Sequence, residues 1–292
     1  MQKTGANMIQ AIFLIRSMDR KGLLSGISTY FYNRGFNILL CQQYTDDREN
    51  LYFMRVCVDI TDMQTTRKEF SSSFAEFART LSLEYSLNFS DTPQRVAILV
   101  SKTSHCLYDL LAHAQDEKDL GCEIPLIISN HPDLESVADR FRIPYFCFPV
   151  VKGKELEQEK QILEQLDKHH IDLVVLARYM RILSKDFIDR YPGRIINIHH
   201  AFLPAFQGSD PYRRAWERGV KMIGATAHYA TVDLDEGPII EQDVERITHE
   251  AGPNDLKRIG KDIERRVLTR AVRAHLQHRI ITSGRRTVVF SR

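Results

Sequence analysis

The chain has 292 residues, of which 43% are hydrophobic and 27% are charged, and it carries a formal net charge of +2. This composition is typical of a soluble globular protein that is long enough for two domains. The small net charge argues against a nucleic-acid-binding surface, and no apolar run approaches the roughly 18 residues of a membrane span.

The first residues, MQKTGANMIQ, lack a basic start followed by a long apolar segment, so no signal peptide is predicted. The five cysteines are odd in number, widely spaced and free of C-x-x-C pairs. They indicate neither a disulfide framework nor a zinc site, and reduced thiols are typical of the cytoplasm. We therefore predict a cytoplasmic protein with no nucleic-acid partner and no membrane attachment.

Residues 8–90 are predicted to form a first domain with the order strand, helix, strand, strand, helix, strand. IQAIFLIRS is the first strand, and DRKGLLSGISTYFYNRG has apolar residues at helical spacing with Gly35 as a stop. NILLCQQYTD and LYFMRVCVDI are strands joined by a polar hairpin loop, and Phe70, Phe74 and Phe77 share one helical face. This βαββαβ order predicts an antiparallel, ferredoxin-like sheet with both helices on one face.

Residues 91–94 are predicted to be a short polar linker, and residues 95–292 a second domain. There, strands alternate with helices, and the strands are RVAILVS, PLIISN, IPYFCFPV, IDLVVLARYM and RIINIHH. Such alternation predicts a mostly parallel, Rossmann-like α/β sheet that is covered on both faces. Ligands of these sheets bind beyond the carboxyl ends of the strands, where Ser101, Arg181 and His199 are expected.

The C-terminal part continues this pattern with the strand PIIEQDVERI and a long helix over residues 253–279. The apolar stripe of this helix should pack against the sheet. RTVVF, near the end of the chain, is predicted to be a final edge strand.

Three polar residues near the ends of two strands suggest a reaction centre. Side chains at positions i and i+2 of a strand share a face, so Asn197 and His199 of NIHH should point into one site and His200 away from it. The later strand GATAHYAT carries His228 and runs into the turn VDLDEG, which contains Asp235. An amide, an imidazole and a carboxylate are the groups that an acyl-type transfer needs.

Each of these residues also has a purely structural interpretation. An asparagine near a strand end is commonly a turn former, a single histidine is commonly a satisfied buried residue, and Asp233 and Asp235 could be solvated turn acids. The pair His199 and His200 suggests a metal, but adjacent strand residues face opposite sides, so no metal is expected. The combination of the three groups favours catalysis.

The runs NIHHAFLPAFQG and GATAHYATVDLDEGPIIEQDV resemble the formyltransferase family that uses 10-formyltetrahydrofolate, and in particular its deformylase branch. The resemblance covers almost the whole chain. It implies that Asn197, His199 and Asp235 are the catalytic residues. It also implies a slot for the pteridine ring, and the substrate-binding residues expected there are Arg181, Ile182, Leu183, His228, Val232 and Asp233.

The segment DRKGLLSGIS after the first strand resembles an ACT domain, a regulatory unit that binds small amino acids between paired copies. The matching residues are Asp19, Arg20, Gly22 and Leu23. The resemblance implies an amino-acid effector and a homo-oligomer, either a dimer or a tetramer. The alternative is that Gly22 only opens a helix whose backbone donors face solvent.

The loop SKTSHCLYDLL after the strand RVAILVS has no glycine-rich phosphate-binding pattern. Members of the resembled family that formylate glycinamide ribonucleotide carry such a loop, whose backbone N–H groups hold the phosphate. Here Lys102, Thr103 and His105 replace it, which disfavours a phosphorylated acceptor. A helix cap by Ser101 or Thr103 is a structural alternative for this loop.

The resemblance therefore implies hydrolysis of 10-formyltetrahydrofolate to formate and tetrahydrofolate, which supplies formate for purine biosynthesis and balances the one-carbon folate pool. Water attacks the formyl carbon, Asn197 and His199 stabilise the oxyanion, and Asp235 assists the proton transfer. Neither a tightly bound cofactor nor a metal is expected. Two alternatives stay open, namely formyl transfer to an unidentified amine and a non-catalytic amino-acid sensor.

Overall fold

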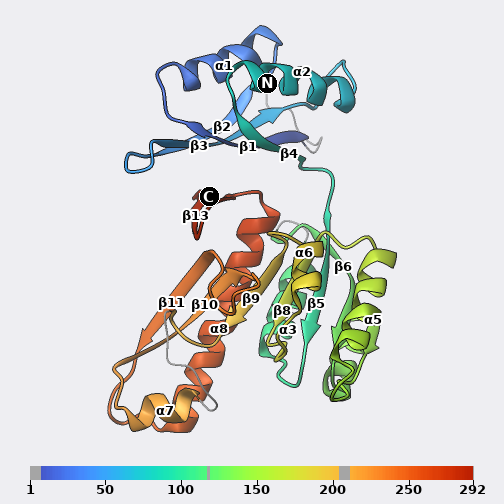
Figure 1. The fold of residues 1–292 in the computed structure, drawn as a ribbon, viewed down its shortest axis with the longest axis vertical. Helices are drawn as coiled ribbons and strands as arrows, with labels where there is room; N and C mark the ends of the chain where they lie inside the picture. The colour runs from blue at the N-terminus through green and yellow to red at the C-terminus, as the bar shows by residue number, and fades with distance from the viewer. Residues whose placement is uncertain (1–7, 117–118, 204–210, 292) are drawn as a thin grey trace. The chain divides into compact units, whose positions relative to one another are not determined.

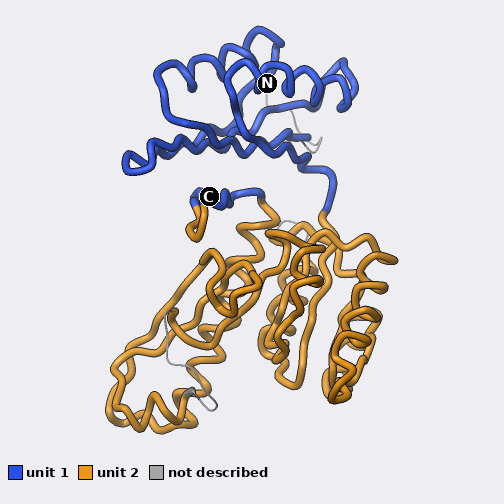
Figure 2. Tube along the Cα trace, viewed as in Figure 1, with its two compact units in different colours: residues 1–93, 278–283, 288–292 blue, residues 94–277, 284–287 orange. Residues whose placement is uncertain are grey.

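The computed structural model describes residues 8–116, 119–203 and 211–291, and its chain divides into two compact units (Figure 2). Unit 1 comprises Met1–Pro93, His278–Ser283 and Val288–Arg292, and unit 2 comprises Gln94–Gln277 and Gly284–Thr287. The division into residues 8–90, 91–94 and 95–292 stays a prediction. Among the described residues, no helix is both long and apolar enough to span a membrane.

Unit 1 contains one four-stranded sheet and two helices. Its elements are β1 (Gln10–Met18), α1 (Leu23–Asn33), β2 (Ile38–Asp46), β3 (Leu51–Asp59), α2 (Arg67–Thr80) and β4 (Glu84–Phe89). The strand order is β2-β3-β1-β4, and every neighbouring pair is antiparallel. Both helices lie on the same face of the sheet (Figure 1), so the predicted ferredoxin-like βαββαβ arrangement is confirmed.

The core of unit 1 forms where the two helices meet the sheet. The Phe13 ring of β1 lies 5.3 Å from the Phe31 ring of α1 and 4.3 Å from the Phe74 ring of α2, measured between centroids. All three side chains are fully buried, so one aromatic cluster joins both helices to the central strand. A reciprocal capping box between Thr66 and Glu69 begins α2.

Unit 2 contains a seven-stranded sheet in the order β11-β10-β9-β8-β5-β6-β7. Its strands are β5 (Gln94–Val100), β6 (Cys122–Ser129), β7 (Tyr145–Cys147), β8 (Leu173–Ala177), β9 (Ile195–His199), β10 (Met222–Tyr229) and β11 (Ile239–Arg246). Its helices are α3 (His105–Ala114), η1 (Pro132–Leu134), α4 (Glu135–Phe141), α5 (Glu155–Lys168), α6 (Lys185–Arg190), α7 (Pro211–Glu217) and α8 (Pro253–Leu276).

The five strands from β7 to β9 are parallel, whereas β10 and β11 pair in the antiparallel sense. This confirms the predicted Rossmann-like, mostly parallel sheet. The central strands β5 and β8 are almost continuously apolar because both of their faces are covered by helices. On one face of the sheet, α5 and α6 pack against β5, β6 and β8. The long helix α8 contacts β9, β10 and α3 (Figure 1).

The C-terminal residues form a hairpin of β12 (Ile280–Ser283) and β13 (Arg286–Val289). RTVVF is therefore a strand, as predicted, but it extends neither main sheet and pairs with β12 instead. The preceding helix α8 ends at Leu276, three residues before the predicted end. His278, two residues after the end of the helix, has a left-handed φ of 48°, which is incompatible with a continuing helix.

Candidate active site

The ends of β9 and β10 lie side by side and bring two predicted residues together. In the antiparallel register, Asn197 is directly opposite His228. Side chains opposite one another on neighbouring strands project to the same face of the sheet. The Asn197 Nδ2 atom accordingly lies 3.2 Å from His228 Nε2.

The turn after β10 carries Asp235 to the same place. Asp235 has a left-handed φ of 56°, and Gly237 approaches the Tyr229 carbonyl so closely that an added Cβ would lie 1.7 Å from the oxygen. Only glycine allows this approach, which fixes the turn. As a result Asp235 Oδ2 lies 3.2 Å from His199 Nδ1, and Asp235 Oδ1 lies 3.5 Å from His228 Nε2.

The electrostatics of this cluster favour an ionised carboxylate. Hydrogen bonding from His199 and then from His228 holds the pKa of Asp235 well below its usual range, although partial burial acts in the opposite direction. His228 is only 2% exposed, and its Nδ1 lies 3.0 Å from the Tyr229 carbonyl oxygen. A carbonyl can only accept, so Nδ1 carries a proton, and Nε2 faces both the Asn197 amide and the Asp235 carboxylate.

His200 does not point away from His199, contrary to the expectation from strand alternation. The two rings stack with centroids 4.7 Å apart and planes 19° apart. The reason is that β9 ends at His199 and the chain then bends, so the alternation of a strand does not extend to His200. Burial, followed by the charges of Arg178 and His199, lowers the pKa of His200 to about 4.

The cluster lies in a cavity of about 240 Å³ in unit 2. Eight of the predicted site residues line it, namely Asn197, His199, Asp235, Arg181, Ile182, Leu183, His228 and Val232. Asp233 is not among the lining residues, and its carbonyl accepts hydrogen bonds within the turn from the Thr231 hydroxyl and the Glu236 N–H. The sequence interpretation missed Arg178, His200 and Leu234 as lining residues, although His200 and Leu234 are adjacent to predicted ones in the sequence.

Two buried residues hold in place the segment after β8, which lines one side of the cavity. The Ser101 hydroxyl donates to Asn130 Oδ1 at 2.7 Å and accepts from the Met180 N–H at 3.1 Å. Glu159 accepts from the Ser184 N–H at 2.8 Å. Ser101 therefore supports the segment that carries Ile182 instead of capping a helix. The residue before α3 is Ser104, and it makes no side-chain cap hydrogen bond.

One cluster with the spacing of metal ligands occurs among the described residues, and it consists of His105, Cys106 and Glu264. It was not predicted from the sequence, because Glu264 lies 159 positions from His105. The Arg178 guanidinium lies 3.4 Å from the Glu264 carboxylate, so a positive charge already lies beside this potential ligand. This cluster is therefore better described as a hydrogen-bonded ion-pair network than as a metal site.

Comparisons with known proteins show the family to which the chain belongs. The formyl transferase family profile matches residues 94–272, and the ACT domain profile matches residues 11–74. A formyltetrahydrofolate deformylase of Synechocystis sp. is 49% identical over 97% of this chain and 99% of that protein. The chain belongs to the formyltetrahydrofolate deformylase family. Membership makes it an enzyme of the hydrolase class and removes the alternative of a non-catalytic sensor.

Solved structures show which part of this deformylase-family chain has a fold that also occurs in other enzymes. A formyltetrahydrofolate deformylase from Pseudomonas syringae pv. tomato is 37% identical with a TM-score of 0.94, covering 98% of this chain and 95% of that one. A glycinamide ribonucleotide transformylase from Symbiobacterium toebii is 30% identical with a TM-score of 0.65, covering 70% of this chain and 98% of that one. The fold of unit 2 therefore also occurs in transformylases, so the fold alone does not determine the formyl acceptor.

Proposed function

We propose that this enzyme hydrolyses 10-formyltetrahydrofolate to formate and tetrahydrofolate. The observation that carries the proposal is the convergence of Asn197, His199 and Asp235, from β9 and the turn after β10, at one cavity. An amide donor, an imidazole and an ionised carboxylate in contact are suited to acyl transfer from nitrogen. The close similarity to proteins named formyltetrahydrofolate deformylase supports the choice of water as acceptor.

The pteridine ring of the substrate is proposed to bind along the segment from Arg181 to Leu183 and beside Val232. Ile182 and Val232 are 71% and 53% exposed, so two large apolar side chains border the cavity without being covered by the protein. A flat heteroaromatic ring would bury them and exchange hydrogen bonds with nearby main-chain groups. His228 and Asp233 complete the proposed binding set, Asp233 through its main chain.

In the proposed reaction, water attacks the formyl carbon and a tetrahedral oxyanion forms. The Asn197 amide donates to the oxyanion, and so does Nε2 of His199, which is proposed to act as an imidazolium whose Nδ1 donates to the Asp235 carboxylate. One such donor is typically worth roughly 3–4 kcal/mol of barrier. Asp235 takes the proton of the attacking water and passes it toward N10 as the C–N10 bond breaks. No step passes through a metal or a cofactor.

The cellular role is proposed from the same similarity. Formate release would supply purine biosynthesis and balance the one-carbon folate pool in the cytoplasm. We further propose a small amino acid as effector of unit 1, near Asp19–Leu23, and a dimer or tetramer. The ACT profile match supports an effector, and Gly22 begins α1 with a left-handed φ of 91° and no side-chain cap.

The direct test is to incubate the enzyme with 10-formyltetrahydrofolate alone and to quantify formate and tetrahydrofolate. Stoichiometric release of both products supports hydrolysis. A transferase, which is the remaining alternative, would stay idle until a suitable amine is added. Activity that requires an added amine would therefore replace the proposed function with formyl transfer.

The pteridine slot leads to a prediction for Ile182. We expect Ile182→Asp to raise KM for 10-formyltetrahydrofolate at least about tenfold, because a charge would face the apolar ring, and to change kcat by less than about threefold. Steady-state kinetics give both constants. Leu156→Asp, at another exposed apolar side chain of unit 2, is the matched control. An unchanged KM in the Ile182 variant would place the folate elsewhere.

Besides lining the binding cavity, His228 is predicted to orient the Asn197 amide. We expect His228→Ala to lower kcat about 30-fold, since the Asn197 amide loses the ring nitrogen that orients it. His228→Gln should recover most of this loss, because the glutamine amide can hydrogen-bond with the same Asn197 side chain. Equal kcat values for the two variants, measured on protein with parental thermal unfolding, would contradict the positioning role.

A further inference from the structure

Behind the reaction centre, three polar side chains surround one buried carboxylate of unit 2. Glu264 of α8 is 1% exposed, and its Oε2 lies 2.7 Å from His105 Nε2 and 3.4 Å from Arg178 Nε. The Tyr212 hydroxyl donates to its other oxygen, Oε1. We call Arg178, Glu264, His105 and Tyr212 the acceptor wall.

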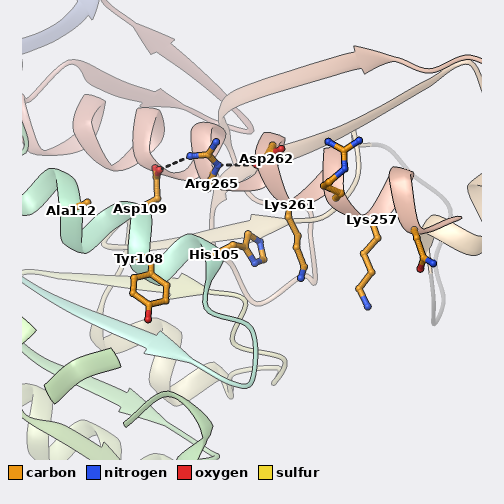
Figure 3. A pocket seen from close by; sticks show the side chains of 10 residues that line it. His105, Tyr108, Asp109, Ala112, Lys257, Lys261, Asp262 and Arg265 are labelled. Carbon is orange, nitrogen blue, oxygen red and sulfur yellow. Dashed lines mark hydrogen bonds and ion pairs between the residues drawn. The ribbon is translucent and has the colours of Figure 1, made fainter. Parts of the chain in front are cut away.

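The acceptor wall lies between two spaces. Arg178 lines the active-site cavity together with His200, whereas His105 lines an outer groove of about 520 Å³ between α3 and α8. In Figure 3 the His105 ring extends from the start of α3 toward the Lys261 side chain of α8. Glu264 contacts both Arg178 and His105, so a single carboxylate joins the residue lining the cavity to the residue lining the groove.

The wall is closely packed. The Tyr212 ring lies so near Gly260 that an added Cβ at that position would be 2.2 Å from the hydroxyl oxygen. Cys106 beside Glu264 is fully buried, and its sulfur lies within 4.8 Å of the His105 and Glu264 ligand atoms. Three side chains hold the Glu264 carboxylate, which makes the network costly to open, although His105 Nδ1 and Arg178 Nε have no hydrogen-bond partner among the described residues. Burial acts to raise the pKa of Glu264, but His105 and Arg178 hold it below the usual value, so the network keeps its charge.

We propose that the acceptor wall selects water as the formyl acceptor by closing the route from the outer groove to the formyl carbon. The inference rests on the proposed hydrolysis and adds the residues that determine its specificity. The same unit 2 fold occurs in proteins named for glycinamide ribonucleotide, so something other than the fold distinguishes the acceptors. A water molecule is small enough to fit in the active-site cavity beside the folate, whereas an amine with a substituent needs more space.

The two competing reactions balance in the same way. In each, the C–N10 bond breaks and a proton of the nucleophile passes to N10 to give tetrahydrofolate. Water forms a C–O bond and yields formate, and an amine forms a C–N bond and yields a formamide. Neither reaction needs an oxidant or a further reactant, and both use Asn197, His199 and Asp235 alike. The acceptor wall therefore affects only the access of the amine to the formyl carbon.

The test measures how the formyl group is divided between water and an added amine. Parent enzyme, His105→Ala and Tyr212→Ala are each given 10-formyltetrahydrofolate with glycinamide or hydroxylamine, and formate and formylated amine are quantified in the same sample. We expect the ratio of formylated amine to formate to rise at least about tenfold in both variants, a change of about 1.4 kcal/mol in relative barrier. Tyr108→Ala is the matched control, because Tyr108 lines the same groove and hydrogen-bonds with Arg140.

The outcomes separate this inference from the proposed function. A ratio within about twofold of the parent in folded His105→Ala overturns the role of the wall, even where hydrolysis or thermal stability falls, since a purely structural role lowers both products together. Should Tyr212→Ala not fold, His105→Ala alone decides. Failure of the parent to release formate without an amine would instead reject the hydrolysis, whatever the ratios are.

Discussion

Replacing Asp235 by Asn is expected to lower kcat for formate release by about three orders of magnitude, or about 4 kcal/mol of barrier. Asparagine has nearly the same size, so the turn and the cavity should keep their shape. Its amide, however, cannot take the proton of the attacking water, and it removes the negative charge 3.2 Å from His199 Nδ1. KM for 10-formyltetrahydrofolate should change less than about threefold, because Asp235 acts mainly in the transition state.

The matched control is Asp233→Asn, two residues earlier in the same turn. The Asp233 main chain holds the turn, and its side chain is not among those that line the cavity, so near-parental turnover is expected. Formate release by both variants is followed under saturating substrate. If Asp235→Asn keeps kcat within about threefold of the parent, or ~0.7 kcal/mol, the proposed role of Asp235 is wrong.

Stability gives an independent check on the ionised state of Asp235. Its folded pKa lies below the unfolded value of about 3.9, so the carboxylate stabilises the fold at pH values above the unfolded pKa. That contribution is lost as the pH falls through the folded pKa. Asp235→Asn should therefore lower the free energy of unfolding at pH 7 and make less difference in strong acid. A pH-independent difference in denaturant midpoint would contradict the ion pair with His199.

Asn197→Ala is expected to lower kcat by 10²- to 10³-fold, roughly the 3–4 kcal/mol of one oxyanion donor. The alanine side chain cannot donate to the developing oxyanion, whereas the folate slot beside Val232 is unchanged. KM should therefore stay within about threefold of the parent. Asn254→Ala, at an exposed amide of the same unit, is the control. A fall in kcat of less than about fivefold would remove Asn197 from the oxyanion site.

A double-mutant cycle makes this prediction sharper. If His228 acts by orienting the Asn197 amide, then His228→Ala should cost less than about threefold in kcat once Asn197 is already alanine. Additive losses would mean that His228 contacts the substrate or water directly. The same cycle between Asn197 and Asp233 should show no coupling, because no contact joins Asp233 to the amide in the described part of the chain.

The sequence by itself predicted both folds and a candidate catalytic set. Phe70 and Phe74 at helical spacing, and the uninterrupted apolar strands β5 and β8, are local patterns that report directly which face of an element is buried. The pairing of Asn197 with His199 followed from strand alternation, which holds within β9. The acidic turn VDLDEG indicated Asp235, and the resemblance added the segment around Ile182; the structure places both at the same cavity.

Only the tertiary structure decided the contacts that depend on where distant segments meet. His200 stacks on His199 because the strand ends between them, and Ser101 supports Met180 from another strand of the sheet. The partnership of His105 with Glu264 spans 159 positions and depends on how α8 packs against α3. Periodicity carries information over a few residues, whereas such contacts arise from the packing of whole elements, which no local pattern encodes.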